Sequence, residues 1–474
     1  MQFDEEYFKS DEFQELLYSY ETSVESGNPV FLDASDLVDI ADYYNYKGED
    51  EKAVSLVVHG LALYPNDALL NVFMARRALM DDDYDTARQH ADAIGDKDSP
   101  DYHYLVAEIL VAENRIDEAD QYLHELYLTL PPEELADFVK DVANLYVDYN
   151  VSDKAYEWMM RSQDDDSDDF KELMARALYG LGRYKDSQRL FNELIDHNPY
   201  SKQYWNALAS AQFMDEDYGG SITSSEYALA IDPKDGEGMI AKANGLLKLN
   251  NYEQAMEYYQ RYISVIGDDP FVRLHIGICL VNLGKNKEAL DQLQEALKVS
   301  QLDESLTAQI LQELAFCYAA LQQTDDALAA LDKTAGLDCD HNDIQVIRGH
   351  ILLSGDRLEE AEATFKKAIR DSAGDPVIVL RVIVSLYDNH YLKASYFMFR
   401  KFFRYVADED FNSGYAYMAL CCFDLGRVDE FLHYLQEAVT RNPNEARLVL
   451  GMLFPEDMQP EQYYDYMLNK YLQL

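Results

Sequence analysis

Apolar residues recur along this chain at the spacing of amphipathic helices, and short polar turns separate the apolar stretches. The segments LFNELI (190–195) and FLHYLQEAV (431–439) place apolar residues at i, i+3, i+4 and i+7, which keeps one face of a helix apolar. Gly182 and Pro199 stand where such stretches end, as residues that stop a helix. With no β-strand pattern beside them, these stretches predict an all-α chain of short helices.

One position returns at a nearly constant interval, and in eleven of its twelve copies it holds Ala or Ser. It follows a turn residue, a gap and an apolar or aromatic residue, as in NNYEQA, which ends at Ala255. The eleven intervals between successive copies range from 32 to 38 residues and average about 34. Such a period predicts a repeat array. The twelve marker positions are Ala53, Ala87, Ala119, Ala155, Ser187, Ser221, Ala255, Ala289, Ala327, Ala361, Ala394 and Phe431.

A second small position lies twelve residues before each marker, and eleven of its twelve occupants are Ala or Gly. Two antiparallel helices approach closely only where both carry small side chains. Each repeat is therefore predicted to be a helix pair that crosses at these two positions. The earlier positions are Ala41, Ala75, Ala107, Ala143, Ala175, Ala209, Ala243, Gly277, Ala315, Gly349, Val382 and Ala419.

The repeats resemble the tetratricopeptide repeat, whose period is 34 residues. The resemblance implies a right-handed α-α superhelix, here of about twelve helix-turn-helix repeats with a capping helix at each end. The sixth repeat carries much of the family's pattern of large, small, aromatic, Ala and Pro positions, in Trp205, Leu208, Ala209, Tyr218, Ala228 and Pro233.

Residues 32–445 are assigned to the twelve repeats. Residues 1–31 are assigned to an N-terminal capping helix, read at 10–26, and residues 446–474 to a C-terminal one, read at 460–473. Terminal repeats need such caps because they otherwise expose an apolar face.

Two repeats depart from the pattern. The interval of 38 residues before Ala327 places about four extra residues near 300–307. The eleventh repeat carries Arg381 and Val382 at first-helix positions that are apolar and small in the family, and Lys401 at a small second-helix position.

The net charge of the chain indicates which classes of partner it favours. The chain has 88 acidic and 40 basic residues, a formal charge of -48 and a pI near 4.3. Such a surface disfavours nucleic acid, which needs clustered Lys and Arg, and favours basic partners. Hydrophobic residues still make up 48% of the chain, which excludes a disordered acidic polymer. Repulsion between the acids further predicts that added salt raises thermal stability.

The five cysteines are odd in number and show no CxxC spacing, so neither a disulfide framework nor a zinc site is expected. Reduced thiols fit a cytoplasmic location. The first residues, MQFDEEYFKS, lack the basic and apolar regions of a secretory signal, and no run of 18 apolar residues predicts a membrane span.

Catalytic motifs are missing from the sequence. It contains no HExxH, no GxSxG and no GxxxxGK[ST], and the repeats leave almost no chain for a separate catalytic domain. The chain is therefore predicted not to be an enzyme and to need no cofactor. The acidic tract 163–169 lacks the spacing of a calcium loop, and Cys339 with His341 gives too few ligands for zinc, so no metal is expected.

Binding is predicted in the groove that the first helices line in this family. Two groove positions are read on those helices, and at one of them every residue is polar or charged through the seventh repeat and, apart from His350, apolar afterwards. We expect an extended peptide or protein segment in the polar half, held by amides and cations, and an apolar segment or an intramolecular element in the other half. The predicted partner-binding residues are Arg76, Tyr104, Lys140, Asn144, Arg176, Asn206, Asn244, Phe316 and His350.

The predicted function is thus a non-catalytic scaffold for protein–protein interaction. Some family members clamp the carboxylate of chaperone tails, but only Lys140 and Asn144 match that clamp, while Leu173, Gln203 and Ala207 do not. Chaperone-tail binding is therefore not predicted. Two alternatives stay open. One is a structural protein that forms a homodimer through the aromatic eleventh repeat or the caps, and the other is an enzyme with an unrecognised groove site.

Overall fold

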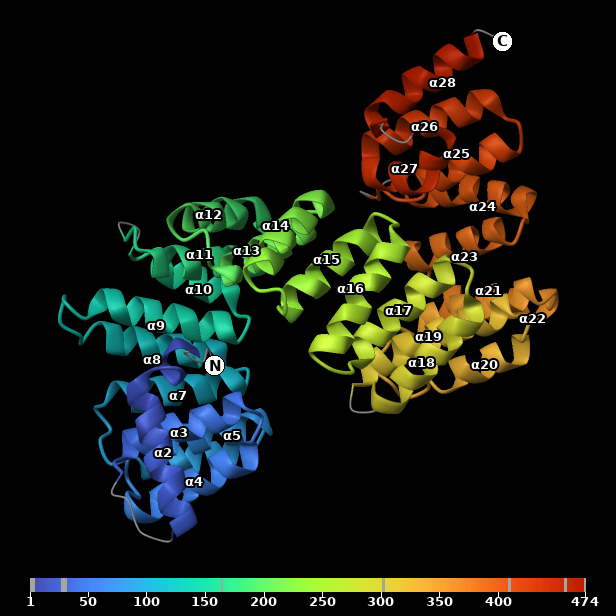
Figure 1. Cartoon of the computed structure of the whole chain (residues 1–474). Helices are drawn as coiled ribbons and strands as arrows, with labels where there is room; N and C mark the ends of the chain where they lie inside the picture. Colours follow the sequence, from blue (N-terminus) through green and yellow to red (C-terminus); the bar gives the residue numbers. More distant parts are fainter. Residues whose placement is uncertain are drawn as a thin grey trace. The chain divides into compact units, whose positions relative to one another are not determined.

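The computed structural model describes residues 5–26, 32–162, 165–300, 303–407, 411–455 and 458–472. All secondary structure in these residues is helical, as Figure 1 shows. The chain divides into two compact units, residues 1–224 (unit 1) and 225–474 (unit 2), and the division falls inside one helix, α14. The all-α prediction is confirmed.

After two helices at the start, unit 1 consists of consecutive antiparallel helix pairs, α3 with α4, α5 with α6 and so on. Its helices are α1 (Glu5–Phe8), α2 (Asp11–Ser26), α3 (Ala34–Tyr46), α4 (Asp50–Leu63), α5 (Ala68–Met80), α6 (Tyr84–Ala93), α7 (Pro100–Ala112), α8 (Ile116–Tyr127), α9 (Leu135–Asp148), α10 (Ser152–Met159), α11 (Asp168–Gly180), α12 (Tyr184–His197), α13 (Lys202–Met214) and α14 (Tyr218–Ile231).

Unit 2 continues the pairing from α15 with α16 to α25 with α26 and ends in two further α-helices. Its helices are α15 (Gly236–Lys248), α16 (Tyr252–Val265), α17 (Pro270–Asn282), α18 (Asn286–Val299), α19 (Glu304–Ala320), α20 (Thr324–Asp332), α21 (His341–Ser354), α22 (Leu358–Asp371), α23 (Pro376–Asp388), α24 (Leu392–Tyr405), α25 (Tyr415–Asp424), α26 (Val428–Arg441), α27 (Pro443–Leu450) and α28 (Tyr463–Leu472).

Most first helices of the pairs begin at a polar cap. The side chains of Asp67, Ser99 and Ser201 each accept a hydrogen bond from a backbone N–H two or three residues into the helix. This bond satisfies one of the donors that the first turn leaves open. Proline occupies the first position of α7, α17 and α23, where no N–H is needed. The caps explain why each turn between pairs ends where it does.

The turn inside each pair contains one residue in the left-handed conformation. Its φ lies between 55° and 74°, and it stands five residues before the small position of the second helix. This backbone shape reverses the chain within a few residues, so that the second helix folds back on the first. The twelve residues are Gly48, Asp82, Asn114, Asn150, Gly182, Glu216, Asn250, Gly284, Gln322, Asp356, His390 and Gly426.

The small positions lie where the two helices of a pair cross. Ala53, Ala87 and Ala255 have no exposed surface, and the same holds for the corresponding Ala41, Ala75 and Ala243 of the first helices. Two repeats carry glycine instead, and each has no room for a methyl group. A Cβ on Gly277 would lie 2.7 Å from Leu293 of α18, and one on Gly349 would overlap the ring of Phe365 of α22.

One marker position read from the sequence is wrong. In the eleventh repeat Ala394 is exposed, whereas Ser395 is fully buried, three residues after the start of α24 and five after the left-handed His390. The crossing therefore lies one residue later than predicted, which restores an interval of 34 residues from Ala361. With this register Phe402, and not Lys401, occupies the inward position of α24, and Lys401 is exposed.

The added residues of the long interval before Ala327 lengthen the first helix of that repeat. The first helix α19 has 17 residues, whereas α17 has 13, and the added turn begins at Glu304. The extra residues predicted near 300–307 lie there, although 301–302 are outside the described residues.

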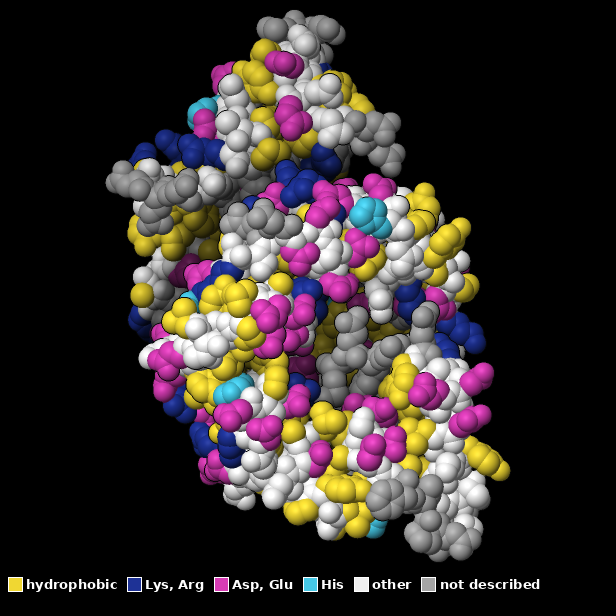
Figure 2. Space-filling view, turned by 90° about the vertical axis from the view of Figure 1, so that its left-hand side faces the viewer, with side chains coloured by type: hydrophobic (Ala, Val, Ile, Leu, Met, Phe, Trp, Pro, Cys, Tyr) yellow, Lys and Arg dark blue, Asp and Glu magenta, His cyan; other side chains and the backbone are white. Residues whose placement is uncertain are grey.

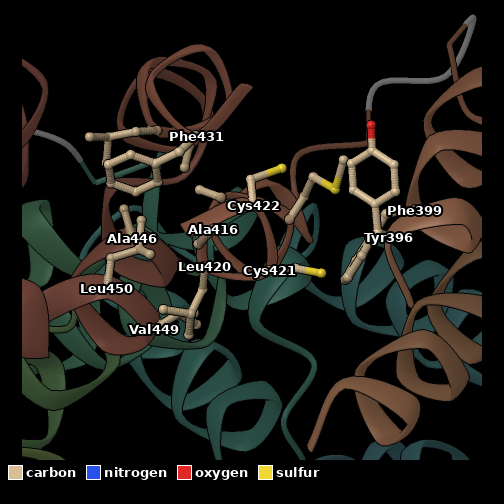
Figure 3. Packing of buried hydrophobic residues seen from close by; sticks show 14 of the residues in the cluster. Tyr396, Phe399, Ala416, Leu420, Cys421, Cys422, Phe431, Ala446, Val449 and Leu450 are labelled. Atoms are coloured by element: carbon tan, nitrogen blue, oxygen red, sulfur yellow. The ribbon is translucent and has the colours of Figure 1, made fainter. Parts of the chain in front are cut away.

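The core runs from pair to pair, and one extensive buried cluster lies in α23–α28 (Figure 3). There Cys421 and Cys422 lie among Phe431, Leu420 and Tyr396. Four of the five cysteines are buried, and burial raises their thiol pKa to about 12 for Cys279, Cys317 and Cys422 and about 11 for Cys421. These thiols pack as apolar side chains.

The two ends of the repeat array are covered by additional helices. Phe13 and Leu17 of α2 are buried in one cluster with Leu37 and Ile40 of α3, and Tyr463 and Met467 of α28 belong to the C-terminal cluster. The helices predicted at 10–26 and 460–473 correspond to α2 and α28. The sequence prediction missed α27, which Asn442 caps through the N–H of Glu445.

Candidate functional site

Successive first helices pack against one another in each unit. In unit 1, α3, α5, α7, α9 and α11 form one such run, and in unit 2, α17, α19, α21 and α23 form another. Successive second helices contact one another more sparsely. The first helices thus form a layer within each of these two runs, and we call the side chains on the outer side of each layer the first-helix face.

The first-helix face of unit 1 carries hydrogen-bonded charges that link neighbouring repeats. Arg76 of α5 donates from Nε to Glu108 Oε2 of α7 at 2.9 Å. Arg176 of α11 donates to Asp148 Oδ1 at 2.9 Å and to Asn144 Oδ1 at 3.3 Å, both on α9. We call these five residues the polar ladder. Charge-assisted bonds of this kind fix the long arginine side chains in place.

The predicted cations are therefore engaged within the protein. Arg76 keeps 41% of its side chain exposed and Arg176 keeps 35%. Lys140 lies 3.2 Å from Asp137 on its own helix. A ligand on this face would meet half-exposed groups of both signs and not a purely basic surface.

Tyr104 joins α7 to α9 in the same layer. Its hydroxyl donates to Asp141 Oδ2 at 2.8 Å, and its ring stacks on Phe138 with 5.8 Å between centroids. Burial, followed by the hydrogen bond, raises the pKa of Tyr104, and burial raises that of Asp141. The hydroxyl therefore stays protonated at neutral pH and orients the carboxylate.

Asp42 of α3 lies within electrostatic range of Arg76, the first residue of the polar ladder along the chain. Burial is the largest cause that raises its pKa to about 6, Asp39 adds to this, and Arg76 opposes it. Its buried Oδ1 makes no hydrogen bond within the part of the chain that the structure describes. The buried oxygen without a hydrogen bond fits the raised pKa, since burial disfavours the charged carboxylate.

Two predicted amides take part in packing within their own unit. Asn206 of α13, in unit 1, is only 4% exposed. Asn244 of α15, in unit 2, accepts a hydrogen bond from the Tyr259 hydroxyl at 2.5 Å. The structure leaves little of Asn206 for a ligand and orients Asn244 towards α16.

The first-helix face of unit 2 brings Phe316 and His350 together. Their rings meet edge to face with 6.1 Å between centroids, and the Asn389 amide lies 3.3 Å from His350 Nδ1. Burial lowers the pKa of His350, while Asp388 partly offsets this. Burial also raises the pKa of Glu313, one turn from Phe316. This face is mainly apolar with a few half-buried ionisable groups.

The sequence reasoning missed several residues of these faces. Asp148 lies four residues after Asn144, one turn further along α9, and Asp388 lies at the end of α23, so both stand outside the groove positions that were read. The i, i+4 spacing from Asn144 was the available signal for Asp148. Glu108 does occupy one of those positions, but it was not recognised as the partner of Arg76.

Acidic side chains are spread over the surface, as Figure 2 shows for the face in view. Basic side chains lie beside them in many places, and ion pairs such as Arg357–Asp325 and Lys154–Asp120 join neighbouring repeats. Pairing of this kind lowers the repulsion that a charge of -48 implies.

Family models agree with this repeated geometry. Two tetratricopeptide-repeat models match residues 173–236 and 238–269, inside the array of helix pairs. The chain contains tetratricopeptide repeats. A model of the coatomer epsilon subunit matches residues 275–454 of this tetratricopeptide-repeat protein.

Curated relatives of the tetratricopeptide-repeat protein are distant. The TPR repeat-containing protein YpiA of Bacillus subtilis is 22% identical over 265 residues, which span 54% of this chain and 61% of YpiA. Anaphase-promoting complex subunit 7 of Dictyostelium discoideum is 24% identical over 182 residues, 38% of this chain and 25% of that protein. The chain thus spans less than two thirds of YpiA and about a quarter of the anaphase-promoting complex subunit.

Solved structures with similar helices include a tetratricopeptide repeat protein from Parabacteroides merdae. It shares 16% identity, with a TM-score of 0.43, over 53% of this tetratricopeptide-repeat protein and 98% of its own chain. YrrB, described as a TPR protein with an unusual peptide-binding site, shares 20% identity with a TM-score of 0.32, over 40% of this chain and 94% of its own.

The acidic tract 163–169 makes polar contacts with basic side chains close to it in the fold. Asp166 pairs with Lys171 at 2.8 Å, and Asp168 lies 2.8 Å from His197 Nδ1, while 163–164 are outside the described residues. Across the described residues, no group of three or more His, Cys, Asp or Glu side chains is placed to hold a metal ion. In the same residues, no helix has the length and apolar character needed to cross a membrane.

One cleft was not predicted. It has a volume of about 1040 Å³ and lies between α2 and the pair α3–α4 of unit 1. Its walls combine apolar side chains with a few polar ones, including Tyr44 and Glu21, which lie 3.5 Å apart.

Proposed function

We propose that this chain is a non-catalytic scaffold that binds an extended segment of a partner protein along the first-helix face of unit 1. The observation that carries the proposal is the polar ladder. Apart from the buried Glu108, it presents partly exposed donors and acceptors from successive repeats on one face, which suits recognition of a peptide backbone and polar side chains.

The pairing inside the ladder refines the sequence prediction. Arg76 and Arg176 are held by Glu108 and Asp148, so the face has no strong net charge. A ligand held here would be recognised mainly by hydrogen bonds. The relatives support a protein partner, since one of them is named as a subunit of a multiprotein complex.

A quantitative pull-down from lysate of the source organism, read by mass spectrometry, tests this function. The test bait carries Arg76→Gln, Lys140→Gln and Arg176→Gln. The control bait carries Arg189→Gln, Lys298→Gln and Lys366→Gln, which removes the same charge from second helices where each cation pairs only along its own helix. Circular dichroism confirms that both baits fold.

We expect at least one partner to be retained by the wild-type and control baits and lost from the test bait. Retention of every partner by all three baits would refute binding at the polar ladder. Self-association is the second candidate, and it predicts that the chain itself is the main captured protein and that its mass in light scattering rises with concentration.

A further inference from the structure

The second helix α24 of unit 2 exposes a row of cations. Lys393, Arg400, Lys401 and Arg404 are all exposed, and their spacing of i, i+7, i+8 and i+11 places them on one side of the helix. The 14 residues of α24 contain no Asp or Glu. Helices α5, α13 and α17 also lack acids, but they carry only one or two Lys or Arg residues each, whereas α24 carries four.

These four cations lack the carboxylate partners that other cations of the protein have. Arg357, at the start of α22, pairs with both Asp325 and Glu360, and Arg427, before α26, pairs with Glu430. In the residues that the structure describes, no ion pair joins any of the four α24 cations to a carboxylate. Arg400 only approaches the Tyr396 hydroxyl, at 3.5 Å. Among the described residues, no carboxylate therefore relieves their mutual repulsion by an ion pair.

Two large aromatic side chains lie on the same side of α24. Phe397 is 60% exposed and Tyr405 is 56% exposed, and they stand four residues before and after Lys401. Aromatic and arginine side chains are the residue types that contribute most to protein interfaces. We call these six residues the α24 basic face.

The opposite side of α24 fixes its orientation. Tyr396, Phe399 and Phe402 are at most 2% exposed and belong to the C-terminal cluster. The Tyr396 hydroxyl donates to Glu430 at 2.7 Å, which ties α24 to α26. The helix cannot rotate its cations towards the acids of its neighbours without losing this packing, so the basic face is preorganised.

We propose that the α24 basic face docks an acidic segment of a partner protein, at a surface separate from the polar ladder. Charge complementarity selects the occupant, and the exposed aromatics add contacts for apolar side chains of that segment. From Lys393 to Arg404 the face is about 16 Å long at 1.5 Å per residue, which matches a short segment.

The acidic residues around the α24 basic face disfavour its binding to a flat anionic membrane. Exposed Asp429 lies beside the Glu430 that bonds Tyr396 on one flank. On the other, the Tyr405 hydroxyl donates to Gly374 O, three residues after exposed Asp371. A membrane wide enough to cover the face would press anionic headgroups against these acids, whereas a narrow segment avoids them.

Fluorescence anisotropy with a labelled 14-residue peptide of alternating Glu with Leu and Phe tests this proposal on the full chain. The test variant carries Lys393→Gln, Arg400→Gln, Lys401→Gln and Arg404→Gln. Its charge-matched control carries Arg189→Gln, Lys287→Gln, Lys298→Gln and Lys366→Gln. The acidic residues 408–410, which follow α24 and lie outside the described residues, stay unchanged in both.

We expect the test variant to bind the peptide at least about fivefold more weakly, because an exposed charge pair contributes a factor of about 1.5 to 5 and four are removed. The control should stay within about twofold of the wild type, and Phe397→Ala should weaken binding without changing its salt dependence. Failure of the wild type to bind the peptide, or equal affinity of the test and control variants, would overturn the proposal.

Two further measurements distinguish other occupants. Flotation with vesicles of phosphatidylserine and phosphatidylcholine should show no binding, and vesicle binding that the test variant loses would overturn the proposal in favour of a membrane. Sedimentation equilibrium should give the same mass for wild type and test variant. A larger wild-type mass would assign the face to a second copy of this chain.

Discussion

Replacing Gly349 by alanine tests whether the small positions set the approach of the two helices of a pair. Gly349 is buried in α21, and a Cβ built on it would lie 2.6 Å and 2.8 Å from two ring atoms of Phe365 in α22. Carbon atoms in contact prefer about 3.5–4.0 Å, so the ring or the helix must move by about 1 Å.

Two opposing effects determine the result of Gly349→Ala. Overpacking of a closed core costs about 1–3 kcal/mol, and replacing glycine in a helix gains about 0.5–1 kcal/mol. We therefore expect the free energy of unfolding to fall by about 0.5–2 kcal/mol. Gly219→Ala in α14 is the matched control, since Gly219 is helical and exposed and its Cβ would meet nothing closer than 4.0 Å. That variant should be more stable by about 0.5–1 kcal/mol.

Urea unfolding followed by circular dichroism at 222 nm measures both variants. Both tryptophans, Trp158 and Trp205, lie in unit 1, so tryptophan fluorescence follows that unit, whereas Gly349 lies in unit 2. Successive transitions are fitted separately because repeat arrays need not unfold in one step. In the double variant with Phe365→Leu, the cost of the alanine should largely disappear. Equal stabilisation by Gly349→Ala and Gly219→Ala would refute the close approach.

Three further changes give simpler outcomes. Gly284→Ala should lower the free energy of unfolding by about 1 kcal/mol in urea titration, because φ at this turn is 72° and no atom lies within 4 Å of a built Cβ, so only the left-handed backbone opposes the change. Asp42→Asn should stabilise the protein increasingly as pH rises from about 4 to 7 in thermal melts. The folded pKa of about 6 lies above the usual value of 3.8, so ionisation opposes folding, and an equal gain at pH 3 and pH 7 would contradict this cause. Raising NaCl from 20 to 200 mM should raise the melting temperature, and a flat profile would mean that the ion pairs already offset the repulsion.

The period of small residues was sufficient to predict the helix pairs, since crossing helices and tight turns impose it on the sequence. It did not decide between Ala394 and Ser395, which are adjacent and both small. The choice depends on where the turn ends, and the left-handed His390 sets that point. Histidine is not a residue that marks such a turn in a sequence.

The sequence alone could not predict which side chains pair on the first-helix face. Arg76 and Glu108 are 32 residues apart, and their meeting depends on how one repeat is rotated against the next. Charge alone does not identify the partner, because several acidic residues are candidates for each arginine. The helix α27 was missed for another reason, because the repeats were assigned to residues 32–445, whereas Asn442 and Pro443 form the cap and first position of a further helix.

Because the thiols are buried, the rate at which a reagent labels them measures how often unit 2 opens locally. All five cysteines lie in residues 225–474, and four are buried with a raised pKa, so a thiol reagent reaches them only when the packing around them opens. Cys339, which is only partly buried, should react first. The slower labelling rates, resolved by peptide mass, would then report opening free energies helix pair by helix pair, without any engineered probe.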